Sequence, residues 1–190
     1  MNAHKQSGLS LIEIMVAVVI SSILILGVTD LFNSSFMAGR SNSELAQMQE
    51  SGRLAMEIIG ADARLAGLQT CTTEIVPEKP LDNAVVLAGS GKTLTLRYID
   101  PANCDDPAAT LQIVTYAFTG TGLTKAESGA AAQPLLDNVD GTFTLLPDSS
   151  DPDTANAVRV ALNVQSTQAG FSAREFSSTY EFKNRLIAKD

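Results

Sequence analysis

GLSLIEIMVAVVISSILILGV, residues 8–28, is the stretch that decides how this chain is organised. From Leu9 to Val28 it contains 20 residues, and all are apolar except three serines, one glycine and one acid. A helix rises about 1.5 Å per residue, so a run of this length covers roughly 30 Å, the thickness of a bilayer's hydrocarbon core. The stretch therefore predicts a membrane-spanning helix.

The acid in this run is Glu13. A charged side chain in hydrocarbon costs several kcal/mol, so acids inside a membrane are rare and usually have a partner. Two interpretations fit the charge pattern. Either Glu13 lies at the membrane boundary and its carboxylate reaches the lipid head groups, or it meets a cation that another group supplies.

Residues 1–8, MNAHKQSG, form a short polar leader whose positive charges are Lys5 and the amino terminus. Positive charge before an apolar run favours a cytoplasmic N-terminus. A secretory signal peptide needs small residues at a cleavage site soon after its apolar core, but Ile25 stands where a small residue is required. We therefore expect the run to be retained as a single membrane span, with the N-terminus in the cytoplasm and the remainder of the chain outside it.

Composition excludes several classes of function. The formal net charge is −8, and an acidic surface repels phosphate backbones, so nucleic acid is not the expected partner. The single histidine, His4, lies in the leader, so the rest of the chain can form neither a His-based triad nor a His-containing zinc site. No serine or threonine has a base to activate it, so we expect no enzyme, no catalytic residue, no metal and no cofactor.

The helix is expected to continue beyond the membrane, because no proline occurs before Pro77. Gly67 is a natural C-terminal stop. Three glycines inside the helix, Gly39, Gly52 and Gly60, each weaken it by up to about 1 kcal/mol relative to alanine, which favours bending between its two halves. One apolar face recurs at steps of three and four residues: Leu45, Met48, Gly52, Ala55, Ile59, Asp62/Ala63 and Ala66.

From Cys71 the pattern changes to short β-branched and aromatic runs separated by turn residues, which predicts strands. Alternation in Thr93–Tyr98 and Val158–Val164 is typical of an antiparallel sheet with one face on a helix. We therefore expect an α+β fold in four parts: leader 1–8, membrane half of the helix 9–30, amphipathic half 31–68, and β-rich domain 69–190. The expected strands are Ala84–Leu87, Thr93–Ile99, Leu111–Phe118, Leu135–Val139, Thr142–Leu146, Val158–Val164 and Ser178–Asn184.

Two other patterns are weaker. Gly89–Thr93 is similar to the end of a phosphate-binding loop, but Val86 stands where the first glycine belongs and a strand follows, so a hairpin turn is expected. An acidic loop offers oxygen ligands for calcium, but it lacks the glycine and the closing glutamate of an EF-hand, so a solvated turn is expected. Its candidate ligands are Asp148, Asp151, Asp153 and Asn156.

Cys71 and Cys104 are the two cysteines of the chain. Both are expected outside the cytoplasm, where an oxidising compartment favours a disulfide. Such a bridge would close a loop of about 30 residues and contribute roughly 3–4 kcal/mol by the chain-entropy estimate. The alternative is two separate thiols, because spacing alone does not bring them together.

The start of the chain resembles the processing signal of type IV prepilins and type II secretion pseudopilins. A short basic leader ends in Gly8 and is followed by Leu9-Ser10-Leu11-Ile12-Glu13 and a further apolar run. The resemblance implies that a prepilin peptidase cleaves after Gly8 and methylates Leu9. It also implies that Glu13 meets the amino terminus of a neighbouring subunit during assembly. The family usually has phenylalanine where this chain has Leu9, and the replacement preserves the apolar character.

The remainder is similar to PilW-type minor pilins, through pieces that are individually loose. This resemblance implies a place in a pilus tip or priming complex with other minor pilins, the major pilin, a PilY-type tip adhesin and the inner-membrane assembly platform. The related pseudopilin J of type II secretion is one alternative. A membrane-anchored periplasmic binding module, with a retained leader and no dependence on Glu13, is another. The matching pieces are Glu50–Leu54, Asp62–Gly67, Cys71, Leu136–Val139, Val158–Leu162 and Phe182–Leu186.

Overall fold

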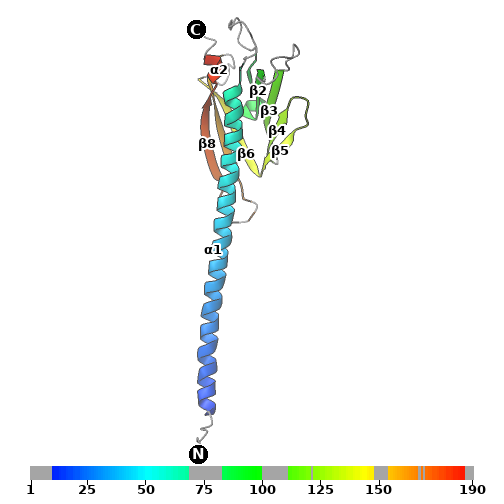
Figure 1. Ribbon diagram of the computed structural model, residues 1–190. Coiled ribbons are helices and arrows are strands. Elements are labelled where there is room, and N and C mark those ends of the chain that lie inside the picture. Colours follow the sequence, from blue (N-terminus) through cyan, green and yellow to red (C-terminus); the bar gives the residue numbers. More distant parts are fainter. Residues whose placement is uncertain are drawn as a thin grey trace, which may run out of the picture. The chain divides into compact units, whose positions relative to one another are not determined.

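The computed structural model describes residues 10–68, 83–99, 111–120, 122–147, 154–166, 168 and 170–186. The chain divides into two compact units, Met1–Ala46 and Gln47–Asp190. The elements, labelled in Figure 1, are α1 (Leu11–Leu65), β1 (Val85–Ala88), the 3-10 turn η1 (Gly89–Gly91), β2 (Thr93–Ile99), β3 (Leu111–Thr119), β4 (Gly122–Glu127), β5 (Gln133–Asp137), β6 (Val139–Leu146), β7 (Ala157–Val164), β8 (Arg174–Glu181) and α2 (Lys183–Leu186).

The strands of the second unit form two antiparallel sheets. Sheet A has the order β1-β2-β3-β4-β5, and sheet B has the order β6-β7-β8. A single residue, Asn138, separates β5 from β6 and has a positive φ of 53°, which lets the chain leave one sheet and enter the other. The expected α+β class, a long N-terminal helix packed on antiparallel sheet, is confirmed, and the strands divide between two sheets.

Strand boundaries follow the sequence pattern unevenly. β2 coincides with the expected Thr93–Ile99, whereas the expected strand Leu135–Val139 is interrupted at Asn138. The last expected strand, Ser178–Asn184, is shifted, because β8 starts at Arg174 and ends at Glu181 before α2 begins. β4 was not expected. Its sequence, GLTKAE, has little β-branched character, and it pairs with β3 in a tight hairpin.

Within the second unit, α1 buries the face that the sequence predicts. Met48, Ala55, Ile59 and Ala63 are buried, and they share one hydrophobic cluster with the inner faces of both sheets. The face is wider than expected, because Met56 and Gly60 are buried as well. Gly67 follows the helix with φ of 81°, and its N–H donates to the Arg97 carbonyl at 2.8 Å. The expected glycine stop is therefore confirmed, and it joins the helix end to β2.

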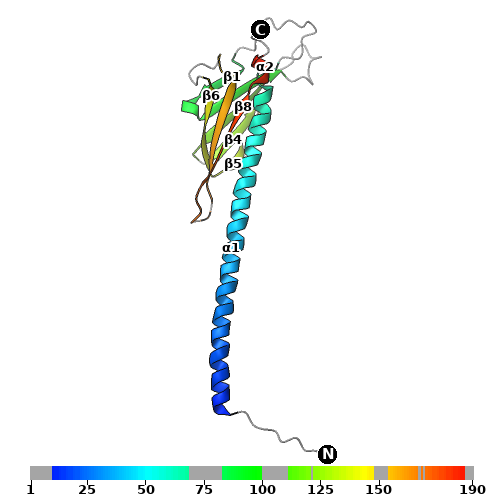
Figure 2. The same ribbon diagram turned by 90° about the vertical axis from the view of Figure 1, so that its left-hand side faces the viewer.

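β8 runs alongside this part of α1 (Figures 1 and 2), and two glycines make the close approach possible. A Cβ on Gly52 would lie 2.6 Å from the Phe176 ring, and a Cβ on Gly60 would meet the Tyr180 ring. The Tyr180 hydroxyl donates to the Met56 carbonyl at 2.7 Å. The missing side chains of Gly52 and Gly60 thus leave room for two aromatic rings to pack against the helix. From the sequence alone, these glycines predict only a weaker helix.

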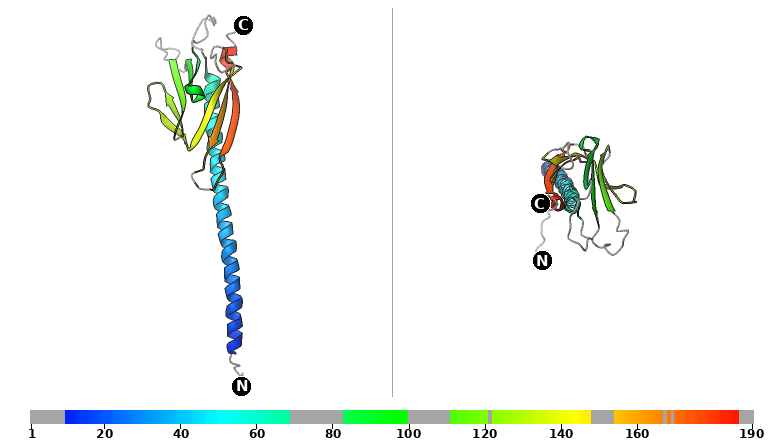
Figure 3. Two further views of the ribbon diagram at one scale, coloured as in Figure 1. Left: turned by 180° about the vertical axis from the view of Figure 1, so that it is seen from behind. Right: turned by 90° about the horizontal axis from the view of Figure 1, so that it is seen from above.

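The two sheets meet at the far end of the core from β8. The rings of Phe118 on β3 and Phe143 on β6 stack with centroids 4.9 Å apart. Seen from above, α1 and sheet B lie to the same side of sheet A (Figure 3). One face of sheet A therefore contacts the core, and the opposite face is directed away from it.

Candidate functional site

The first unit is a helix whose apolar side chains have no protein around them. Large hydrophobic residues from Leu11 to Met37 are exposed, with fractions between 51% at Ile14 and 76% at Leu11. α1 is long and apolar enough to cross a membrane, and its most apolar window is 0% buried. Soluble surfaces rarely carry a contiguous apolar area of this size. Lipid or other protein subunits must therefore cover it.

Two hydroxyl groups, one in the apolar run and one directly after it, have hydrogen-bond partners within the helix itself. Ser22 donates to the Val18 carbonyl and Thr29 donates to the Ile25 carbonyl, each at 2.7 Å. A hydroxyl that bonds one turn back exposes no unpaired donor to hydrocarbon. These polar residues are therefore compatible with burial in a membrane or in a bundle of apolar helices.

Glu13 lies in the first turn of α1, which Ser10 opens. The Ser10 carbonyl accepts from the N–H groups of Glu13 at 3.0 Å and Ile14 at 3.3 Å. The helix dipole favours an anion in this turn by only about 0.3–1 kcal/mol, which is less than the cost of burying a carboxylate in hydrocarbon. Within the described residues the Glu13 carboxylate has no ion-pair or hydrogen-bond partner. A buried Glu13 would need a cation from outside this set.

The next charged residue is Asp30, and no charge separates it from Glu13. Seventeen helical steps of about 1.5 Å place the two acids about 26 Å apart along the axis. The hydrocarbon core is about 30 Å thick. If Asp30 lies at one boundary of the membrane, Glu13 is therefore just inside the other. This position favours a carboxylate that needs a partner over one that is freely hydrated.

The other sequence-predicted sites have mixed outcomes. Gly89–Gly91 forms a 3-10 turn between the antiparallel strands β1 and β2, so the hairpin prediction is confirmed and no helix follows as a phosphate loop requires. Gly8, Leu9, both cysteines and the three aspartates of the acidic loop lie outside the described residues. Asn156 is described, and its backbone bonds to Leu146 and Phe182. In the part of the chain that the structure describes, no group of three His, Cys, Asp or Glu side chains could hold a metal.

The structure contains a polar cluster between α1 and sheet A that was not predicted from the sequence. Asp62 on the helix accepts from the Tyr116 hydroxyl at 2.5 Å and pairs with Lys125 at 3.0 Å, and Lys125 also pairs with Glu127 at 2.9 Å. Burial, and next the bond to Asp62, raise the pKa of the Tyr116 hydroxyl well above its usual range. Burial alone lowers the pKa of Lys125, but its bonds to Glu127 and Asp62 raise it overall. The cluster therefore holds a paired anion and cation between helix and sheet.

This geometry gives a stability prediction. Asp62→Asn is expected to destabilise the folded chain by about 1–2 kcal/mol, because the amide oxygen still accepts from Tyr116 but no longer balances the partly buried Lys125 ammonium. Thermal unfolding of the full-length protein in detergent, at pH 7, measures the change. Since folding raises the pKa of Lys125, its ion pairing is complete below the ordinary lysine pKa of about 10.4 and is lost only at higher pH.

Glu127→Gln is the matched control for Asp62→Asn. Its side chain is 63% exposed against 14% for Asp62, so its bond to Lys125 is screened by water. We expect a change of less than about 0.5 kcal/mol for this variant. Equal effects of the two substitutions would show that Asp62 has no special role between helix and sheet.

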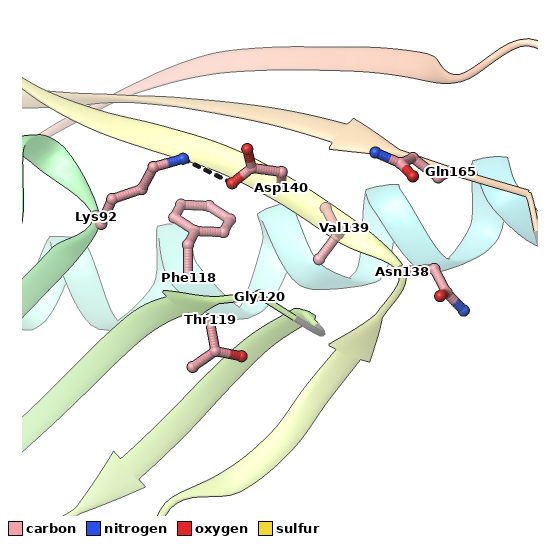
Figure 4. Close-up of a pocket in the computed structure, with 8 residues that line it drawn as sticks. All are labelled: Lys92, Phe118, Thr119, Gly120, Asn138, Val139, Asp140 and Gln165. Atoms are coloured by element: carbon pink, nitrogen blue, oxygen red, sulfur yellow. Dashed lines mark hydrogen bonds and ion pairs between the residues drawn. The ribbon is translucent and has the colours of Figure 1, made fainter.

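A second feature is an open groove of about 580 Å³ at the seam of the two sheets (Figure 4). Lys92 points across it to Asp140 at 2.6 Å and donates to the Gly141 carbonyl at 2.9 Å, while the Phe118 ring lies beside the pair. The hydrogen bond from Lys92 lowers the pKa of Asp140. Lys92 and Asp140 neutralise each other, so the groove offers no net charge to a ligand. The ion pair instead joins the residue between η1 and β2 to β6.

Comparison with known proteins bears on the first unit. Residues 3–29 match the family model described as the prokaryotic N-terminal methylation motif, and no curated protein matches the chain. The matched segment contains Gly8, Leu9 and Glu13 and ends one residue before Asp30. It covers the first part of α1, as far as residue 29, where the apolar side chains are exposed. The chain therefore carries the N-terminal motif of type IV pilin-like proteins, a structural class that is processed by prepilin peptidase and assembles with other pilins.

Proposed function

We propose that this protein is a PilW-like minor pilin, a structural subunit in the initiation or tip complex of a type IV pilus. It is cleaved after Gly8 and N-methylated on Leu9. It then stays in the inner membrane as a single-pass protein, with its N-terminus in the cytoplasm and its C-terminal domain in the periplasm, until it is polymerised. The observation that carries this proposal is the methylation motif at residues 3–29, which includes an apolar helical segment whose side chains are exposed and whose one acid is Glu13.

Polymerisation runs through the first half of the helix. When a subunit leaves the bilayer, its exposed apolar side chains exchange lipid for the helices of its neighbours. The methylated amino terminus of an adjacent subunit meets Glu13, so the ammonium and the carboxylate neutralise each other in an apolar surrounding. A subunit shifted along the axis would leave both charges unpaired. The pair therefore sets the axial register of the filament.

The remaining parts have separate roles. Residues 9–30 anchor the subunit and pack in the filament, residues 31–68 carry the domain, and residues 69–190 form the domain that meets other minor pilins, the major pilin and a PilY-type tip adhesin. The domain is acidic and has few lysines, so its surface repels the phosphates of nucleic acid and suits protein partners better. The inner-membrane assembly platform receives the subunit before incorporation.

The disulfide between Cys71 and Cys104 is part of this proposal. Mass measurement of the periplasm-exposed protein after alkylation without reduction is expected to find no alkylated cysteine, and two after reduction. Two alkylated thiols in the unreduced sample would end the disulfide proposal and leave the pilin proposal intact.

Intact mass and N-terminal sequence, from cells with and without prepilin peptidase, test the function itself. We expect a chain that begins at N-methylated Leu9 only when the peptidase is present. An unprocessed chain starting at Met1 in both strains would refute the pilin proposal. It would favour a membrane-anchored binding module, in which Glu13 is a boundary acid.

A type II secretion pseudopilin of the J type is the second candidate, because the methylation motif is shared by both machines. The two predict different losses on deletion of the gene. A minor pilin is needed for surface pili, and a pseudopilin is needed for release of secreted proteins into the medium. Loss of secretion with normal piliation would favour the pseudopilin.

A further inference from the structure

Four strands lie at sheet edges, β1 and β5 in sheet A and β6 and β8 in sheet B. An edge strand presents N–H and C=O groups to which a strand of another molecule can pair, so folded domains usually protect their edges. Three of these edges have a recognisable protection: β1 is only four residues long, β5 contains Pro134, and β8 runs beside α1 (Figures 1 and 2). β6 is eight residues long and contains no proline, so its protection must come from elsewhere.

Alternate residues of β6 direct their backbone groups away from β7. The Gln165 N–H donates to the Asn138 carbonyl at 2.7 Å, so in this antiparallel register the even-numbered residues of β6 bond to β7. The N–H and C=O groups of Gly141 and Phe143 therefore point to the free edge. At Phe143 the turn η1 covers that edge, because a Cβ on Gly91 would lie 2.7 Å from the Phe143 carbonyl oxygen. Gly141 needs a different cover.

Two side chains occupy both backbone groups of Gly141. Its N–H donates to Asp140 Oδ1 at 2.8 Å, and its C=O accepts from Lys92 Nζ at 2.9 Å. The same Nζ and Oδ1 atoms are joined to each other at 2.6 Å (Figure 4). Gly141 thus meets one acceptor and one donor, as it would in a pairing with the C=O and N–H of a neighbouring strand. We call the side chains of Lys92 and Asp140 the edge cap.

The edge cap lies at the surface, where a strand from another molecule would approach. The side chains of Lys92 and Asp140 are 41% and 62% exposed. Both residues line the groove of about 580 Å³ and also a second hollow of about 280 Å³ that reaches Thr142, so the cap stands between the two hollows. Water screens an exposed ion pair, and such pairs add little to the free energy of folding. The position of the cap on the polar groups of the edge therefore explains it better than a contribution to stability does.

We propose that the edge cap prevents β6 from pairing with β6 of a second copy of this chain. Without the cap, the N–H and C=O of Gly141 are open to a strand, and two identical edges pair antiparallel about a two-fold axis. One sheet would then run through both domains. Asp140 opposes this pairing a second time, because the carboxylates of the two copies approach each other across the axis. The cap has this role whether or not the chain is assembled into a pilus.

Removal of both side chains from the full-length protein in detergent tests the proposal. The double variant Lys92→Met with Asp140→Ala opens both backbone groups of Gly141. With the photo-crosslinker p-benzoylphenylalanine at the exposed position 142 of β6, we expect at least tenfold more covalent dimer from the double variant than from the wild-type edge. Arg159→Met with Glu175→Ala removes one cation and one anion from other exposed positions of sheet B and is the matched control. It should crosslink no more than the wild type.

The unfolding temperature shows whether the double variant is folded. A folded double variant with no more dimer than the wild type would overturn the proposal. So would equal dimer from a crosslinker at position 115, on the outer face of sheet A, because the association would then not run through β6.

A second measurement applies if the double variant does not fold. In Asp140→Ala, the amide hydrogen of Gly141 should exchange with solvent at least tenfold faster than in the wild type, because it has lost its acceptor. An unchanged exchange rate would mean that the Asp140 carboxylate does not occupy this N–H, and it would overturn the proposal.

Discussion

Replacing Glu13 by alanine is expected to leave membrane insertion intact and to lower incorporation into filaments at least tenfold. The run from Leu11 to Val28 loses its only charge, so insertion becomes easier. In the filament that we propose, however, the methylated amino terminus of the neighbour loses the anion with which it pairs. A tenfold loss corresponds to about 1.4 kcal/mol, and an unpaired charge in an apolar surrounding costs several times that amount.

Quantitative blotting of sheared filaments against the membrane fraction measures this effect. Asp30→Ala removes the other acid next to the run and serves as the control, because Asp30 lies at the polar end of the apolar segment. It should incorporate normally. Glu13→Gln keeps the shape without the charge and should assemble as poorly as Glu13→Ala. Normal incorporation of either Glu13 variant would rule out the register role and leave Glu13 as a boundary acid.

The long helix and its buried face could be predicted because both are local properties of the sequence. Hydropathy over 20 residues defines the first half, and steps of three and four define the face that carries Met48, Ala55, Ile59 and Ala63. β2 was found for the same reason, since Thr93–Ile99 alternates clearly and ends in turn residues. These features could be predicted because each one depends on residues that are close together in the sequence.

The contacts that were missed join distant segments. Lys125 stands 63 positions after Asp62 in the sequence. Helical periodicity does not show which strand residue a helix residue will contact. The strand that carries Lys125, β4, was itself not expected from the sequence. β4 itself depends on its hairpin with β3 rather than on its own composition. The break at Asn138 also depends on tertiary context, because Leu135–Val139 is too short for a pattern to show whether the chain continues in one sheet or enters a second at Asn138. Asparagine tolerates positive φ, and that tolerance was the one available signal.

The glycines of α1 show the same limit, and they give the second large prediction. Gly60→Ala is expected to destabilise the second unit by about 1–3 kcal/mol, although alanine favours a helix by about 1 kcal/mol over glycine. The new methyl group would occupy the place of the Tyr180 ring. That ring must move, and its hydroxyl then loses the bond to the Met56 carbonyl. Thermal unfolding of the full-length protein in detergent, followed by circular dichroism, measures the loss.

Gly39→Ala separates the two effects that a glycine has in this helix. A Cβ at position 39 has nothing within 4 Å, so this variant should gain helix stability and show no loss in the same unfolding measurement. The double variant Gly60→Ala with Tyr180→Ala should lose less stability than the sum of the two single variants, because the methyl group no longer meets a ring. If Gly60→Ala instead stabilised the protein, as is expected for Gly39→Ala, the Tyr180 ring would not pack directly on the helix at Gly60. The only effect of Gly60 would then be to lower the stability of the helix.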